Sequence, residues 1–502
     1  MIRTRFAPSP TGYLHVGNLR TALYAYIIAK QNNGQFLLRI EDTDRERYVA
    51  DGVEHILKAL YWVGIEPDEG VKLDEYSTPG EVQVIEEGAK GPYTQSKRLE
   101  IYQKYAAELI DKGAAYHCFC SNERLDKLRE EQQKNKLPSG YDRFCLTHVP
   151  LEEASERIKK GERHVVRLKM PKDGETVFND TIRGEVRFKN NLVDDQVLIK
   201  SDGFPTYHMA VVVDDHLMEI THVIRGEEWI SSTPKHLQLY TYFGWQPPQF
   251  AHLPLFLNAD RSKLSKRQGD VSVHDYRTKG YLPEAILNFM AFLGWNPGDE
   301  REIFSLTDLV KEFSLAKVSK AGGVFNLEKL DWYNREYLKR ISDDELVKRA
   351  LPFLIEAGLI KSETSIAEFQ KPWLAQVLAL EKERVTTLAE FPEALKFVFE
   401  LPAYLPELLV WKKSSREEAL SVLEALENLL HQVPESKWDR EGLEKMVVEW
   451  IVQKDYQKGA VLSPLRVALS GQQNSPGPFE IAAVLGKTES LHRIKHALAL
   501  LS

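Results

Sequence analysis

The sequence has few cysteines and no long apolar run. It contains three cysteines among 502 residues, and this odd number suits free thiols or metal ligation in a reducing compartment better than disulfides. No apolar stretch approaches the length that spans a bilayer, and residues 1–12 lack the apolar region of a signal peptide. We therefore expect a cytoplasmic protein with no membrane partner.

An excess of basic residues is also missing. The formal net charge of −8 at pH 7 argues against a protein that coats nucleic acid, although local basic patches on an acidic body can still bind one. Hydrophobic residues make up 43% of the chain and charged residues 28%, as in ordinary globular proteins. A chain of 502 residues is too long for one core, so about three to five domains are expected.

A loop near the start of the chain has features of a ligand site. Residues 5–12 read Arg-Phe-Ala-Pro-Ser-Pro-Thr-Gly, and residues 15–18 read His-Val-Gly-Asn. Gly12 and Gly17 allow the backbone to approach a ligand closely. The apolar spacing that follows predicts a helix that is capped at Gly34. A glycine turn that opens a helix attracts phosphate, but it is as often only a tight connection.

Residues 1–66 are typical of an α/β unit. Strands are expected at 3–7 and 36–40, each followed by a helix, and this order predicts a parallel sheet with ligands beyond the carboxyl ends of its strands. The second strand leads into Glu41-Asp42-Thr43-Asp44-Arg45. This acidic turn either caps the next helix or recognises a substrate ammonium or ribose. Residues 67–92 predict a surface insertion without visible chemistry.

All three cysteines lie in one segment. Cys118-x-Cys120 precedes a charged helical stretch and then Cys145-x-x-His148. Zinc takes about four nitrogen or sulfur ligands, and two close pairs around a loop supply them. We predict structural Zn²⁺ on Cys118, Cys120, Cys145 and His148, with Tyr141 as a less orthodox substitute for the histidine. Three unrelated thiols are the alternative.

The middle of the chain predicts an inserted domain and a return to α/β structure. Residues 150–200 mix a short helix with strand-like runs. The apolar run 209–213 has the pattern of a central strand. Residues 220–224 predict a strand that leads into Arg225, which is either a surface charge or an anion ligand.

The last part of the chain is predicted to be helical. It follows a basic loop at 258–269, which is either a solvated loop or a flexible arm that closes on phosphates. From about 280 onward, apolar residues recur at helical spacing. No short-period repeat or low-complexity tract is present.

Together these motifs resemble the class I aminoacyl-tRNA synthetases, and within that class the glutamyl-tRNA synthetases of bacterial type. Residues 15–18 are similar to the first ATP signature of the family, with Asn18 in place of the common final histidine. Residues 263–267, Lys-Leu-Ser-Lys-Arg, are similar to the second signature. Further similar segments occur in family order at 6–12, 39–44, 202–207, 214–216, 221–228 and 463–471, so the resemblance leaves mainly 71–90 unmatched.

The resemblance implies a split Rossmann α/β catalytic domain with an inserted α+β domain, followed by an all-α anticodon-binding region. The expected domains are the first Rossmann half (1–101), the inserted acceptor-stem-binding domain with the zinc site (102–204), the second Rossmann half (205–252), the mobile ATP-signature loop with the stem-contact region (253–342) and the helical anticodon-binding region (343–502).

The implied reaction is ATP-dependent ligation of L-glutamate to the 3′ end of tRNA(Glu) through a glutamyl-adenylate. Because the glutamate carboxylate is already ionised at neutral pH, catalysis is mainly positioning and charge stabilisation. The resemblance implies His15, Lys263 and Lys266 as catalytic residues. ATP with Mg²⁺ is expected to bind through Gly12, His15, Gly17, Lys263, Ser265, Lys266 and Arg267.

Glutamate recognition needs two cationic anchors and one anionic anchor. By motif match, Arg5 holds the side-chain carboxylate, Arg225 the α-carboxylate and Glu41 the ammonium. Tyr207 and Ser9 complete this predicted pocket. Some family members have Asn where this chain has Val211, so that contact is absent or replaced.

The resemblance also implies how tRNA binds. The inserted domain would meet the acceptor end, the helical end would read the anticodon, and Arg384 would contact its last base. The family is usually monomeric and often needs tRNA before it activates glutamate. The alternatives are a glutamyl-queuosine tRNA synthetase, which lacks the helical end, a glutaminyl-tRNA synthetase, whose family ends in β-barrels, and a catalytically silent RNA-binding paralogue.

Overall fold

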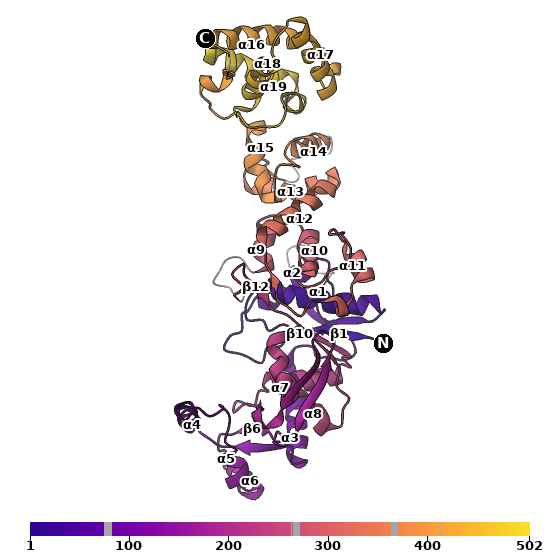
Figure 1. Cartoon of the computed structure of the whole chain (residues 1–502), viewed down its shortest axis with the longest axis vertical. Coiled ribbons are helices and arrows are strands. Elements are labelled where there is room, and N and C mark those ends of the chain that lie inside the picture. Colours follow the sequence, from indigo (N-terminus) through magenta and orange to yellow (C-terminus); the bar gives the residue numbers. More distant parts are fainter. Residues whose placement is uncertain (75–82, 263, 265–271, 363–369, 413) are drawn as a thin grey trace. The chain divides into compact units, whose positions relative to one another are not determined.

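The computed structural model describes the chain in two compact units (Figure 1), Met1–Arg277 with Pro283–Lys329 and Thr278–Leu282 with Leu330–Ser502. The described residues are 1–74, 83–262, 264, 272–362, 370–412 and 414–502. The predicted site residues Lys263, Ser265, Lys266 and Arg267 lie outside them. Within the described ranges, no helix is both long enough and apolar enough to cross a bilayer.

An eight-stranded sheet organises the first unit. In spatial order its strands are β4 (Val84–Glu87), β3 (Glu69–Leu73), β2 (Gln35–Leu38), β1 (Arg3–Phe6), β10 (His222–Gly226), β11 (Gln249–Leu253), β7 (Glu175–Asp180) and β8 (Gly184–Lys189). The strands from β3 to β7 in this order run parallel, and the edge strands β4 and β8 are antiparallel to their neighbours. The predicted parallel sheet is therefore present, with the two expected strands at its centre.

Smaller sheets and helices complete the first unit. The other strands are β5 (Ala115–Cys118), β6 (Val165–Leu168), β9 (Val197–Ile199), β12 (Phe256–Leu257) and β13 (Gly323–Val324). The helices are α1 (Val16–Gln31), α2 (Gly52–Trp62), α3 (Leu99–Asp111), α4 (Asn122–Lys134), α5 (Phe144–His148), α6 (Leu151–Lys159), α7 (Tyr207–Leu217), α8 (Thr233–Phe243), α9 (Val273–Thr278), α10 (Pro283–Phe292) and α11 (Leu306–Glu312). One apolar core joins α3, α7 and α8 to the β5–β6–β9 sheet.

The strand order creates a switch point between β1 and β10. From β1 the chain proceeds to β2 and β3 on one side, whereas from β10 it proceeds to β11 on the other. The connections therefore diverge at these two strands, and in open α/β sheets ligands bind in the crevice beyond their carboxyl ends. The loop that follows β1 and the residues at the end of β10 both lie there.

Helix α1 begins the first connection and packs against β1, β2 and β10. It ends at Gln31, with Asn32 as its C-cap and Asn33 in the left-handed region, so the predicted cap at Gly34 is wrong. Gly34 is instead required by a close approach, because a Cβ atom there would lie 2.1 Å from the carbonyl oxygen of Ile2.

The predicted strand at 209–213 is also wrong, because these residues belong to helix α7. Residues Met209 to Asp215 are all buried, since α7 packs against both α3 and α8. A helix that is buried on most sides shows no polar stripe, so a short apolar run does not distinguish it from a central strand.

Two segments assigned to insertions instead extend the main sheet. Residues 67–92, predicted as a surface insertion, provide β3 and β4. The inserted segment 102–204 is divided: β5, β6 and β9 form their own sheet, whereas the hairpin β7–β8 joins the main sheet through β11. Phe250 of β11 pairs with Asp180 of β7.

The second unit is helical in its described part, as predicted (Figure 1). Its helices are α12 (Leu327–Arg340), α13 (Asp343–Glu356), α14 (Lys371–Ala379), α15 (Phe391–Phe399), α16 (Arg416–His431), α17 (Arg440–Gln453), α18 (Lys458–Ser470) and α19 (Pro478–Leu501). Helix α19 packs against α16, α17 and α18. Arg493, which is buried in α19, donates to the carbonyl oxygens of Phe397, Val398 and Leu469 and so ties α15 and α18 to this helix.

Candidate active site

A cavity of about 1220 Å³ opens at the switch point of the main sheet. Its lining includes the predicted glutamate and ATP residues that the structure describes, which are Arg5, Ser9, Gly12, His15, Gly17, Glu41, Tyr207 and Arg225. They come from the ends of β1, β2 and β10 and from the first turns of α1 and α7. The structure thus gathers into one cavity residues that lie up to 220 positions apart in the sequence, Arg5 and Arg225.

His15 lies at the N-terminus of α1. Its Nδ1 accepts a hydrogen bond of 2.9 Å from the backbone N–H of Gly17. A neutral imidazole with Nδ1 as acceptor carries its proton on Nε2, so His15 presents an N–H donor beside the positive end of the α1 dipole. Gly12, in the preceding loop, has φ +143°, a conformation that side chains rarely allow.

Described residues within and shortly after the second predicted signature lie at this cavity or beside it. Leu264 lines the cavity, and its N–H donates to the carbonyl oxygen of Phe256. After the signature, Ser272 forms a backbone bridge with His15, and the N–H of Val273 donates to the carbonyl oxygen of Leu14. Ser272 and Val273 therefore lie beside the N-terminus of α1.

Arg5 is held by a buried carboxylate. Its Nε donates to both oxygens of Asp215, at 3.1 and 3.3 Å. Asp215 also accepts a 2.8 Å hydrogen bond from Nη1 of Arg39, and Nη2 of Arg39 donates to Glu41 at 3.0 Å. Arg39 thus links the carboxylate that holds Arg5 to the predicted ammonium-binding residue.

The charge state of these carboxylates follows from their neighbours. Burial raises the pKa of Glu41, although Arg39 and Arg5 oppose this effect. Burial also disfavours the charged form of Asp215, but Arg5 and Arg39 outweigh it and lower the pKa of Asp215. Because Asp215 touches two guanidinium groups and Glu41 touches one, Asp215 is the more firmly ionised of the two.

Asp214, the neighbour of Asp215 in α7, connects this network to α3. Its carboxylate accepts hydrogen bonds from Arg98 Nε at 2.8 Å, Gln95 Nε2 at 2.9 Å and the Tyr102 hydroxyl at 2.7 Å. These contacts fix the end of α7 and, through Asp215, the position of Arg5. Sequence reasoning identified the Asp-Asp pair as a family-like segment but assigned it no role.

Arg225, at the end of β10, has partners for all five of its N–H groups. They are His252 Nε2 (3.0 Å), Tyr207 Oη (3.3 Å), His236 Nδ1 (3.1 Å), Trp229 O (3.4 Å) and Thr233 Oγ1 (2.9 Å). The prediction did not include His236 and His252, because they lie on other elements and follow no motif. Burial raises the pKa of Tyr207, so its hydroxyl stays neutral beside the guanidinium.

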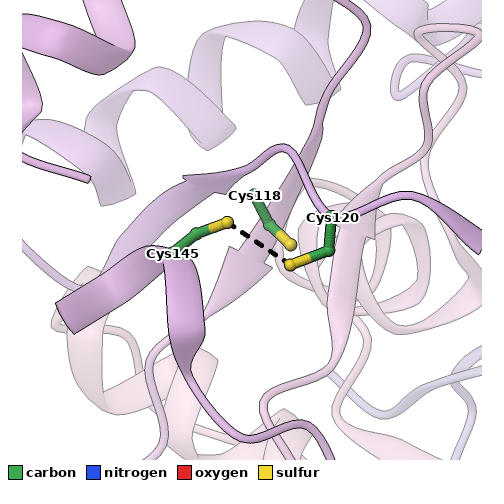
Figure 2. A group of neighbouring side chains, drawn as sticks. All are labelled: Cys118, Cys120 and Cys145. Carbon is green, nitrogen blue, oxygen red and sulfur yellow. Dashed lines mark hydrogen bonds between the residues drawn. The ribbon is translucent and has the colours of Figure 1, made fainter. Parts of the chain in front are cut away.

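The three cysteines converge at the end of β5, as Figure 2 shows. Their sulfur atoms lie within 4.8 Å of one another. The Tyr141 hydroxyl contacts Cys118 Sγ at 3.4 Å and Cys120 Sγ at 3.3 Å, and it accepts the N–H of Cys145 at 2.9 Å. Hydrogen bonds from Cys145, Tyr141 and Arg167 lower the pKa of Cys118 to about 4, which favours the thiolate that binds metals.

His148 does not join this group, and its prediction as the fourth ligand is corrected. Its ring stacks on Phe144 at 4.5 Å, and its Nδ1 contacts the Phe144 carbonyl oxygen at 3.0 Å and Thr147 Oγ1 at 2.7 Å. The ring is therefore turned back along α5. Tyr141, the substitute that the sequence allowed, lies where the fourth ligand was expected.

Arg384, the predicted anticodon contact, lies in the second unit. Its guanidinium is about half exposed and forms an ion pair of 2.8 Å with Glu381. Burial raises the pKa of Glu381, and Arg384 opposes that shift. The exposed part of the guanidinium is accessible to a ligand.

The chain matches known protein families over nearly its whole length. Residues 1–332 match the model of the catalytic domain of class I tRNA synthetases (E and Q), and residues 345–498 match an anticodon-binding domain. It is 47% identical to the glutamate–tRNA ligase of Finegoldia magna, covering 99% of both chains. It is 46% identical to that of Alkaliphilus metalliredigens, over 99% of this chain and 98% of the relative. A crystal structure of a glutamate tRNA ligase from Elizabethkingia meningosepticum, in complex with its amino acid, superposes with a TM-score of 0.86, 36% identity and full coverage of both chains.

Proposed function

The chain belongs to the glutamate–tRNA ligase family of class I tRNA synthetases, and from this we propose that it joins glutamate to the 3′ end of tRNA(Glu) in two ATP-dependent steps. The observation that carries the proposal is that one cavity is lined by the described residues that are predicted to bind glutamate and ATP. The alternatives are not favoured, because the relatives match along the helical C-terminal unit as well as the catalytic part.

In the first step, the α-carboxylate of glutamate attacks the α-phosphate of ATP and pyrophosphate leaves. The nucleophile is already ionised, so the residues need only position the reactants and stabilise the developing charge. We propose that the His15 Nε2–H and the N-terminus of α1 stabilise phosphate oxygens. Lys263 and Lys266 would add positive charge, and ATP would bring Mg²⁺ with it. In the second step, a ribose hydroxyl of tRNA attacks the acyl group.

Arg5, Arg225 and Glu41 are proposed to recognise the three charges of glutamate. Arg5 would hold the side-chain carboxylate, because Asp215 fixes its Nε and orients the rest of the group. Arg225 would hold the α-carboxylate. Its contacts with Tyr207 and Trp229 are the longest, at 3.3 and 3.4 Å, so a carboxylate can replace them with stronger charge-assisted bonds. Ser9 lines the same cavity.

The cysteine group is proposed to hold a structural zinc ion. The donor set fits the metal, since three sulfur atoms converge and a phenol oxygen contacts two of them. Cys118, Cys120, Cys145 and Tyr141 would be the ligands. When bound, the ion would cross-link the end of β5 to α5 and take no part in the reaction.

The proposed tRNA contacts follow the predicted domains. Residues 102–204, with the cysteine group, would contact the acceptor end, and residues 253–342 would contact the stem. The helical region 343–502 would bind the anticodon, as its match to an anticodon-binding domain supports, and Arg384 would contact the last anticodon base.

Amino-acid-dependent pyrophosphate exchange tests the proposed function. The purified chain is assayed with glutamate, glutamine or aspartate, each with and without tRNA(Glu). We expect exchange with glutamate, dependent on or increased by tRNA. Preference for glutamine would indicate a glutaminyl enzyme, and exchange with glutamate that tRNA(Glu) neither supports nor increases would indicate a glutamyl-queuosine enzyme. No exchange with any of the three amino acids would support the silent paralogue.

A further inference from the structure

Three buried polar side chains lie on three adjacent strands of the main sheet. Arg225 of β10 is directly opposite His252 of β11 in the parallel register, and Asp180 ends the next strand, β7. Their exposed fractions are 5%, 0% and 3%. Such groups are costly to bury unless each hydrogen-bonding atom has a partner. The partners define which atom of each group carries a proton.

Asp180 acts only as an acceptor. Its Oδ1 accepts the backbone N–H groups of Ile182 at 2.9 Å and Arg183 at 2.8 Å, and its Oδ2 accepts the backbone N–H of His252 at 3.1 Å. These backbone donors favour the ionised carboxylate, and together with His252 they lower the pKa of Asp180 despite its burial. The remaining contact, 2.6 Å between Oδ2 and His252 Nδ1, is therefore donated by the imidazole, so the proton is on Nδ1.

His252 then has an unprotonated Nε2 that faces Arg225. Nε of Arg225 always carries a hydrogen, and it lies 3.0 Å from His252 Nε2. A ring that donates from Nδ1 and accepts at Nε2 is neutral. Burial and the nearby Arg225 lower the pKa of His252 more than Asp180 raises it, in agreement with this state.

The acceptors that hold Arg225 are neutral, so they orient its guanidinium without placing a negative charge beside it. His252 fixes Nε, His236 Nδ1 contacts Nη1 at 3.1 Å and Thr233 Oγ1 accepts from Nη2 at 2.9 Å. Arg5 differs, because a carboxylate contacts it directly. A guanidinium whose orientation is set by neutral groups keeps more of its attraction for a ligand carboxylate.

We propose that Asp180 and His252 are positioning residues for glutamate binding: Asp180 fixes the tautomer of His252, whose Nε2 orients Arg225 toward the α-carboxylate. The proposal rests on the proposed function, in which Arg225 binds that carboxylate. It also gives a role at the amino-acid site to Asp180, although this residue lies within the inserted segment 102–204.

Two substitutions of His252 separate its two hydrogen bonds. In His252→Gln, the amide oxygen lies near the position of Nε2 and can still accept from Arg225. In His252→Asn, the shorter amide lies near Nδ1 and can donate to Asp180 but cannot reach Arg225. His222→Gln is the control, because His222 is on the same strand as Arg225 and its Nδ1 contacts Thr221.

Glutamate and ATP KM values and kcat are measured by pyrophosphate exchange on the full chain. We expect His252→Asn to raise the glutamate KM roughly tenfold to hundredfold, as for the loss of a hydrogen bond to a charged group, and His252→Gln to raise it less. The ATP KM should stay near that of the wild type in both, and His222→Gln should change neither KM. Equal glutamate KM values for the two His252 variants, or a parallel rise in the ATP KM, would overturn the proposal.

The tautomer of His252 can also be measured directly on the wild-type chain. Histidine ¹⁵N chemical shifts of the wild-type chain are expected to show His252 protonated on Nδ1, and a proton on Nε2 would refute the proposal. His252→Gln assigns the signal by difference. If the wild-type chain shows no glutamate-dependent exchange, the proposed function fails. If the wild-type chain shows this exchange but the His252 substitutions leave the glutamate KM unchanged, only the positioning role fails.

Discussion

Replacing Asp215 by Asn tests the buried network that holds Arg5. The substitution keeps the size of the side chain and removes its charge. Asp215 contacts Arg5 at 3.1 Å and Arg39 at 2.8 Å, and the exposed fractions of these side chains are 4% or less. In the variant, two buried guanidinium groups therefore lose the carboxylate that they share.

The magnitude follows from this burial. Removing one partner of a buried ion pair costs about 3–5 kcal/mol, and the amide oxygen of Asn still accepts one hydrogen bond, so we expect about 3 kcal/mol. For a unit of roughly 300 residues, an unfolding entropy of about 2 cal/mol/K per residue converts this loss into a Tm decrease of about 5 °C.

The loss of stability in Asp215→Asn is expected to be larger at neutral pH than at acidic pH. The pKa of Asp215 is lowered in the folded chain, so its contribution to stability is present above the ordinary carboxyl pKa of about 4 and is lost as the pH falls through the folded value. The Asn variant lacks this contribution at every pH. The difference in Tm between wild type and variant should therefore be largest near pH 7 and should narrow below about pH 4.

Differential scanning calorimetry at several pH values measures this difference, with the glutamate KM as a second readout. We expect the KM to rise at least about tenfold, because the Arg5 guanidinium loses its charged partner. A variant as stable as the wild type at pH 7, or a Tm difference that widens on acidification, would refute the account of the network.

Three further predictions concern the other proposed sites. Arg5→Ala should raise the glutamate KM by about a hundredfold or more while the ATP KM survives, since a charge-assisted anchor is lost; an unchanged glutamate KM in pyrophosphate exchange would remove the assignment. Metal analysis should find about one zinc per chain, less in Tyr141→Phe and the same in His148→Ala, and chelation should lower Tm; a chain free of metal, with a Tm unaffected by chelator, would end the zinc proposal. Arg384→Ala should raise the KM for tRNA several-fold, in keeping with about 1 kcal/mol for a partly exposed contact, and leave the glutamate KM unchanged; a change in glutamate KM alone would contradict it.

Short apolar runs and helical periodicity predicted several elements close to their observed positions. The first strand, helix and second strand are where the pattern placed them, and α16 and α17 bury their apolar stripes as expected. The pattern misled at 209–213, where α7 is buried on most sides. It gave no signal for β4, because three of the four residues of this edge strand are exposed and side chains on a polar edge do not alternate clearly.

The site was predictable where residue types carry their own chemistry and not where only the fold joins them. Arg5, His15, Glu41 and Arg225 were found through motifs, and they line one cavity. The contact between Asp180 and His252 joins residues 72 positions apart, and no local pattern indicates such a pair.

The sequence did not show, for a similar reason, that Tyr141 and not His148 contacts the cysteine group. Sequence spacing suggested both residues, but spacing does not reveal which way a ring turns. In the structure the His148 ring stacks on Phe144, so it points away from the cysteines that it follows in the chain.

The pairing of β7 with β11 affects how this protein can be recombined with its relatives. A chimaera that exchanges residues 102–204 as one cassette would replace the hairpin β7–β8, which supplies an inner strand and an edge strand of the catalytic sheet. The donor chain would then also supply the residue at the position of Asp180, which contacts His252. Crossovers that leave 175–189 with the host sheet keep that carboxylate. The rest of the insert, which we propose contacts the acceptor end of tRNA, can then be exchanged while the proposed glutamate site keeps its own support.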